Sequence, residues 1–212
     1  MSLKSARITH MFDAQWLGPP ALRELDDAAL VGAIGDWTRA SAAAEAHALA
    51  AIAELVRRRC IDEHPDWACD DWDACAAELS CALTVGHGRA CRQMDLAVTL
   101  RDRLPNVGAL FLAGILSSRI VTAIAARTAL VTDGDALRQM DKLIADQAVR
   151  WGVLSQYKLE QAVDAAMDRI DPGAVGRTCS ASRDRDFTVG DANGTTGIIS
   201  VWGRLSTYGP NI

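Results

Sequence analysis

One regular pattern of small and apolar residues in the N-terminal third constrains the fold of this 212-residue chain more than any other feature. These residues alternate at spacings of four and three, which places them on one helix face: Leu30, Ile34, Trp37, Ser41, Ala44, Ala48, Ala51 and Leu55. Asp26 can cap the start of such a helix, and Arg57, Arg58 and Arg59 suit its end, where the dipole favours cations. The pattern predicts one helix from about Asp27 to Arg59, roughly 50 Å long.

Shorter helices follow, separated by residues that begin or end helices. We expect them over residues 71–83, 89–103 and 107–113, then from 117 or 118 to the break at 133–135, over 136–150, and from 156 to the break at 171–173. Asp71, Asn106 and Ser155 are expected to cap helices, and Gly114 to end one in the left-handed conformation. Alanine dominates the apolar residues and only 5% of residues are aromatic, which favours closely packed helices.

The C-terminal part changes character at about Gly176, where a charged linker begins. Residues 187–190 and 195–203 read as two strands joined by a turn over 191–194. We therefore expect a mainly α fold, a multi-helix bundle with a long N-terminal helix that ends in a small C-terminal β-hairpin. The expected organisation is a flexible arm over 1–20, a helical domain over 21–175, and a charged linker with an incomplete hairpin over 176–212.

Charge and hydropathy limit the partners of the chain. The net charge is −5, which argues against an electrostatic grip on nucleic acid or anionic membrane by the whole surface, while a local basic face stays open. The start of the chain lacks the apolar block of a signal peptide. The longest apolar run, Val107–Leu116, is shorter than the roughly 20 residues that span a bilayer. We expect a cytoplasmic protein with no membrane partner.

Neither the cysteines nor the histidines form a familiar site. The six cysteines are Cys60, Cys69, Cys75, Cys81, Cys91 and Cys179. Together with His64 and His87 they could suggest zinc, but no Cys-x-x-Cys pair occurs, so we expect free, mostly buried thiols, no metal and no cofactor. The chain also lacks a glycine-rich phosphate loop, a nucleophile elbow and a His-x-x-x-His pair, so we do not expect an independent enzyme.

The segment 76–103 resembles a helix-turn-helix motif. Ser80, Thr84 and Ala90 fall at its small, turn and buried positions. The second helix would present three side chains to base edges, Arg89, Arg92 and Gln93, and two to phosphates, Arg101 and Arg103. Thr84 resists the positive φ that glycine usually supplies at the turn, and the acidic stretch from Asp62 to Glu78 would repel phosphate. An ordinary helical hairpin in the core is the alternative interpretation.

Several ordered pieces between about Leu25 and Leu205 resemble the actinobacterial domain-of-unknown-function family numbered 222, also called the 13E12 repeat proteins. These pieces are Leu25–Val31, Ala53–Arg59, Glu78–Val85, Arg103–Pro105 with Ala113–Ser117, Leu159–Pro172, and Gly194–Leu205. The resemblance implies that full-length members continue into a C-terminal HNH endonuclease domain, which holds a metal ion with histidines. No histidine follows His87 in the last 125 residues (212 − 87), so we do not carry the nuclease activity over and interpret the chain as a truncated copy.

These observations predict a non-catalytic helical domain of an HNH-endonuclease-associated protein that retains weak DNA association through residues 76–103. The alternative is a structural or protein-interaction module without a nucleic-acid role. In that case the regular face of the long helix would pack inside the chain or form a homodimer with a second copy.

Overall fold

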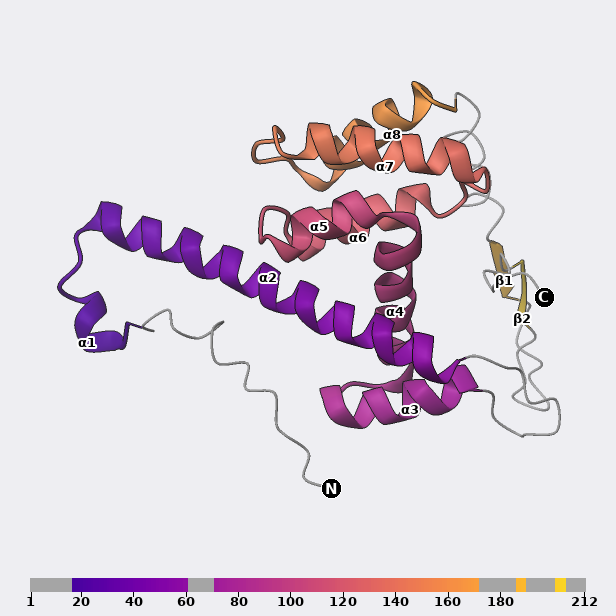
Figure 1. Cartoon of the computed structure of the whole chain (residues 1–212), viewed down its shortest axis with the longest axis horizontal. Coiled ribbons are helices and arrows are strands. Elements are labelled where there is room, and N and C mark those ends of the chain that lie inside the picture. Colours follow the sequence, from indigo (N-terminus) through magenta and orange to yellow (C-terminus); the bar gives the residue numbers. More distant parts are fainter. Residues whose placement is uncertain (1–16, 61–70, 172–185, 190–200, 205–212) are drawn as a thin grey trace.

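The computed structural model describes residues 17–60, 71–171, 186–189 and 201–204, and helices dominate it (Figure 1). The helices are α1 (Pro19–Leu22), α2 (Asp27–Arg59), α3 (Asp71–Leu83), α4 (His87–Val98), the π-helical η1 (Thr99–Arg103), α5 (Pro105–Leu112), α6 (Ser118–Thr128), α7 (Gly134–Ala148) and α8 (Gln156–Asp168). The expectation of a mainly helical chain is confirmed. The predicted division into arm, helical domain and linker stays a prediction, since its outer parts lie largely outside these residues.

Helix α2 has the predicted bounds. The Asp26 side chain accepts a hydrogen bond from the backbone N–H of Ala29 at 2.8 Å, which caps the helix. At the other end, Arg57 and Arg58 both donate to the Glu54 carboxylate at 2.6–2.8 Å. Their hydrogen bonds lower the pKa of Glu54 to about 2. The arginine run lies in the last turn of α2, as predicted, and two of its members are held there by the Glu54 carboxylate.

The face that α2 buries is not the predicted one. The buried positions are Ala42, Ala46, Leu49, Ile52, Ala53 and Val56, whereas Ser41, Ala44, Ala48 and Ala51 are exposed. Alanine and serine occupy 10 of the 14 positions 40–53 of the helix, so several faces fit the same spacing. Contact with α4 and α5 selects the face that carries Leu49 and Val56.

The N-terminal half of α2 extends beyond the packed helices (Figure 1). Val31 and Ile34 keep 69% and 59% of their surface exposed. Leu30 and Trp37, the other large side chains of the predicted face, are half-buried.

Helices α3, α4, α5 and α6 contact α2, and α7 and α8 lie on the far side of this layer, with α7 against α5 and α8 against α6 (Figure 1). Fully buried side chains join these helices into one core, among them Phe111, Ile124, Met140 and Leu159. Ser155 caps α8 through the backbone N–H of Lys158, as predicted.

The start of α5 differs from the prediction that Asn106 caps it. The helix begins two residues earlier, at Pro105, and the cap is Asp141 of α7. This buried carboxylate accepts hydrogen bonds from the backbone N–H groups of Asn106 and Val107 at 2.8 and 3.0 Å, and from the Asn106 amide at 2.7 Å. The helix ends as predicted at Gly114, whose φ of 69° is left-handed.

Two short strands pair antiparallel, β1 (Asp186–Val189) and β2 (Val201–Arg204), with Phe187 opposite Gly203. The segment that would join them into the predicted hairpin lies outside the described residues, so the hairpin itself stays a prediction. No helix in the described ranges is both long and apolar enough to cross a membrane.

Candidate functional site

Helices α3 and α4 form a helix-turn-helix arrangement. Only Thr84, Val85 and Gly86 separate them, and α4 runs steeply across the direction of α3 (Figure 1). Two helices that cross in this way after a three-residue turn are typical of a helix-turn-helix, whereas a helical hairpin would place them antiparallel. The second helix begins at His87, two residues before the predicted start.

The turn takes the conformation that the motif requires although its residue is not glycine. Thr84 has a φ of 54°, the one positive φ among the described non-glycine residues. Ser80 compensates: its hydroxyl donates to the carbonyl oxygen of Val85, and its own carbonyl accepts from the Val85 N–H at 3.1 Å. These bonds hold the turn closed on both sides of Thr84. Local hydrogen bonds of this kind can support a backbone conformation that is unfavourable by itself.

A shared core fixes the pair of helices against α2. Cys75, Ala76 and Leu79 face inward from α3, and Ala90, Met94 and Ala97 from α4. Ala76, Ala90 and Met94 have no exposed surface. The small residues permit close approach of the helices, so the orientation of α4 is set by packing rather than by the turn alone.

The predicted base-reading residues divide into two groups. Arg89 and Arg92 are exposed on α4, and within the described ranges neither guanidinium has an ion-pair partner. Gln93 is different, because its side-chain oxygen is covered by protein and has no hydrogen-bond partner in the described part of the chain. The outward face of α4 therefore offers two arginines, and the Gln93 amide oxygen does not lie on it.

The two residues predicted to contact phosphate are held by the fold. Arg101 pairs with Asp102 and donates to the backbone carbonyl of Ala53 at 2.6 Å. Its hydrogen bond lowers the pKa of the Asp102 carboxyl. Arg103 donates to three backbone carbonyls at the end of α6, those of Thr128, Ala129 and Val131, at 2.9–3.3 Å. A phosphate contact by either arginine would compete with these bonds.

Part of the acidic stretch that argued against phosphate is neutralised within the protein. Glu78 forms an ion pair with Arg59 of α2, and the Asp73 carboxylate lies 3.6 Å from Nε2 of His87. The Arg59–Glu78 pair lies at the surface, so it is worth little for stability, but it offsets one negative charge of the acidic stretch.

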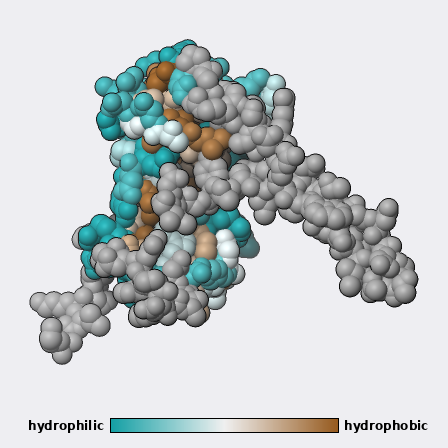
Figure 2. Space-filling model, turned by 90° about the vertical axis from the view of Figure 1, so that its right-hand side faces the viewer, coloured by the Kyte–Doolittle hydropathy of each residue, from teal (hydrophilic) through white to brown (hydrophobic). Residues whose placement is uncertain are grey.

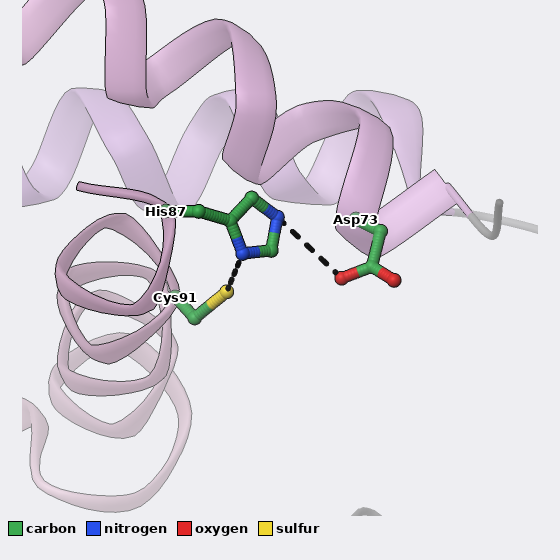
Figure 3. A group of neighbouring side chains, drawn as sticks. All are labelled: Asp73, His87 and Cys91. Atoms are coloured by element: carbon green, nitrogen blue, oxygen red, sulfur yellow. Dashed lines mark hydrogen bonds and ion pairs between the residues drawn. The ribbon is translucent and has the colours of Figure 1, made fainter.

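Asp73, His87 and Cys91 form a cluster that sequence reasoning missed (Figure 3). The imidazole of His87 lies between the other two side chains, with Nδ1 at 3.6 Å from Sγ of Cys91. His87 and Cys91 are one helical turn apart on α4, a spacing visible in the sequence, whereas Asp73 comes from α3 and only the fold brings it close. In the coloured part of the face that Figure 2 shows, hydrophilic residues surround several separate hydrophobic patches.

Comparison with known proteins gives a family match over most of the chain. Residues 36–207 match the family described as "Domain of unknown function (DUF222)". The "Uncharacterized protein in est 3'region" of Mycobacterium tuberculosis is 51% identical over 196 residues, which are 92% of this chain and 56% of that protein. "Uncharacterized protein Rv3776" of Mycobacterium tuberculosis strain H37Rv is also 51% identical over 196 residues, 92% of this chain and 38% of the relative.

A third relative, "Uncharacterized protein Rv2100" of the same strain, is 48% identical over 206 residues, which are 97% of this chain and 37% of that protein. The chain thus spans between 37% and 56% of the length of these curated relatives. No solved structure matches it.

Proposed function

We propose that this chain, which belongs to the DUF222 family of domains of unknown function, is a non-catalytic helical domain that binds DNA weakly through α4. The observation that carries this proposal is the α3–turn–α4 unit, whose second helix presents Arg89 and Arg92 outward. An α-helix fits the major groove, and arginine is the side chain that pairs with two acceptors on guanine.

The support for α4 as the recognition helix is its orientation. The buried positions Ala90, Met94 and Ala97 fix one side of the helix against α2 and α3. Arg89 and Arg92 lie three residues apart, so they share the other side. In a helix-turn-helix, residues near the start of the second helix reach the bases, and Arg89 and Arg92 lie in its first two turns.

The same geometry sets the strength of the interaction. Two free arginines release few counterions, and the net charge of the chain is −5. The proposed binding is therefore weak and lost as salt rises, and sequence preference is limited to what two side chains can read.

The test is fluorescence anisotropy of labelled duplex DNA with the full chain at low and raised salt. The doubly substituted variant Arg89→Ala/Arg92→Ala should lose at least about tenfold in affinity, since each good arginine–guanine pair is worth roughly 1–3 kcal/mol. The control Lys142→Ala/Arg150→Ala removes the same charge from exposed residues of α7 and its end, and should bind like the unsubstituted chain. Equal loss in both variants, or no binding at low salt, contradicts the proposal.

A second candidate function, self-association, rests on the projecting half of α2. Val31 and Ile34 are exposed there, and Leu30 and Trp37 lie at the four-three spacing of a coiled-coil seam. The occupant we propose is the same helix of a second copy, because apolar residues at four-three spacing pair with a helix of the same pattern, and exposed alanines extend this stripe toward the bundle. Light scattering at rising concentration should show a dimer that Ile34→Asp abolishes. A monomeric mass throughout excludes this candidate.

We propose no catalytic step for this chain. Its resemblance to the 13E12 repeat proteins implies that longer members join this helical domain to an HNH nuclease.

A further inference from the structure

We propose that Asp73, His87 and Cys91 bind one divalent transition-metal ion of the zinc class, and that the ion clamps the start of α4 to the start of α3. The sequence predicted no metal site because no familiar ligand motif is present. The inference rests on the fold, which brings the three side chains together, and it does not depend on the proposed DNA binding.

The chemistry of the three side chains suits zinc. A thiolate, an imidazole and a carboxylate are the ligands that zinc takes from proteins, at distances of roughly 2.0–2.3 Å. Around a tetrahedral ion, such distances separate neighbouring ligand atoms by about 3.5 Å. One ligand atom from each of the three residues lies within 4.8 Å of the other two, so modest side-chain movement closes the site.

Two of the three proposed ligands lie at the surface. Asp73 and His87 are exposed, whereas Cys91 is half-buried and packs against the core, so the site would close mainly by movement of the His87 and Asp73 side chains. As drawn in Figure 3, the imidazole presents Nδ1 to the thiol and Nε2 to the carboxylate. Rotation of the ring directs one nitrogen toward the point between Sγ of Cys91 and the carboxylate, and water completes the tetrahedron.

The backbone positions of the ligands are well defined. His87 is the first residue of α4 and Cys91 lies one turn further, so one helix face holds both. Asp73 lies in the first turn of α3. The ion would bridge the two helices across Thr84–Gly86, adding a cross-link to a turn that otherwise depends on Ser80.

Charge favours the same site. The zinc ion carries two positive charges, and the Asp73 carboxylate with the Cys91 thiolate supplies two negative ones, so the occupied site is neutral. Cys75, the buried cysteine of α3, is not part of the cluster, and burial raises the pKa of its thiol.

The test uses the full chain, reduced and stripped with chelator, and Co²⁺ as the probe. A cobalt–thiolate bond gives a charge-transfer absorption that aqueous Co²⁺ lacks. We expect one equivalent of Co²⁺ to saturate this absorption and Zn²⁺ to displace it. Cys91→Ser should abolish the absorption, and His87→Ala or Asp73→Asn should weaken Co²⁺ binding by at least about tenfold, the lower bound for the loss of even an outer-shell partner.

Two matched controls keep the test specific. Cys81→Ser removes an exposed cysteine of α3, and His47→Ala an exposed histidine of α2, and both should bind Co²⁺ like the unsubstituted chain. Circular dichroism of each variant checks that it is folded. The absence of a thiolate absorption in the folded chain, or its persistence in Cys91→Ser, overturns the inference. DNA affinity is measured separately, so either proposal can fail alone.

Discussion

At the scale of single residues, two arginines that the sequence predicted to contact phosphate, Arg101 and Arg103, donate hydrogen bonds within the protein. Arg103 satisfies three backbone carbonyls at the end of α6, a place where unpaired carbonyls and the helix dipole both attract a cation. Asp141 does the reverse for α5, accepting from the first N–H groups of that helix. Neither contact is visible in the sequence, because the partners are 25 or more residues apart.

Replacing Arg103 tests this structural role. We expect Arg103→Met to lower the free energy of unfolding by about 1–3 kcal/mol, because carbonyls then lose a charged donor. Urea denaturation monitored by circular dichroism measures the change. Arg92→Met removes an exposed arginine and should shift stability by no more than about 0.5 kcal/mol. Equal effects of the two substitutions would show that Arg103 is not a capping residue.

Gly114 is a second position where a single atom matters. Its φ is 69°, and a Cβ there would lie 2.5 Å from the carbonyl oxygen of Arg39 on α2. Gly114→Ala should therefore destabilise the protein by roughly 2 kcal/mol or more, through the left-handed conformation and the clash together. Gly152→Ala is the control in the same denaturation experiment, since nothing lies within 4 Å of its added Cβ, and it should be close to neutral.

At the scale of elements, α2 shows the limit of periodicity. Its ends were predicted because caps and the arginine run are local signals. The prediction of its buried face was wrong. Alanine is as compatible with a core as with a surface, so the four-three spacing fits more than one face. The larger residues Leu49, Ile52 and Val56 mark the correct face, which α4 and α5 cover.

A pair of alanines distinguishes the two faces experimentally. Ala46 is 4% exposed, and Ala48 belongs to the exposed face. Ala46→Glu should cost roughly 3 kcal/mol or more, because it buries a charge without a partner. Ala48→Glu should leave the thermal midpoint nearly unchanged. A larger loss of stability in Ala48→Glu than in Ala46→Glu would show that the face predicted from the spacing is the buried one.

At the scale of the whole molecule, α2 contacts both the α3–α4 pair and the layer formed by α5 and α6 (Figure 1). Its C-terminal half packs on α3 and α4, which carry the candidate sites, and α5 and α6 also contact it. Its N-terminal half contributes no buried residue before Ala42. Tertiary packing therefore stabilises only part of one continuous helix.

Hydrogen exchange should reveal this division. A helical segment of about 15 residues is marginal in water without tertiary contacts, so amides of residues 31–41 should exchange much faster than those of 42–59 in a dilute sample. Mass spectrometry of peptic peptides gives the comparison. Strong protection of residues 31–41 that grows with protein concentration would instead indicate a covered seam, as in the second candidate function.

The sequence by itself determined the helical class, most helix ends and the position of the turn at Thr84. These features depend on caps, glycines and proline, whose effects act over a few residues. The sequence also indicated that the DNA-contact candidates Arg89 and Arg92 are exposed, because the buried positions of one short amphipathic helix determine which of its side chains face outward.

Only the tertiary structure decided which face of α2 is buried, what Arg101 and Arg103 contact, and that Asp73 meets His87 and Cys91. Each of these depends on the relative placement of two helices. That placement results from close packing of small side chains such as Ala76 and Ala90, and alanine gives the sequence no signal that specifies its partner.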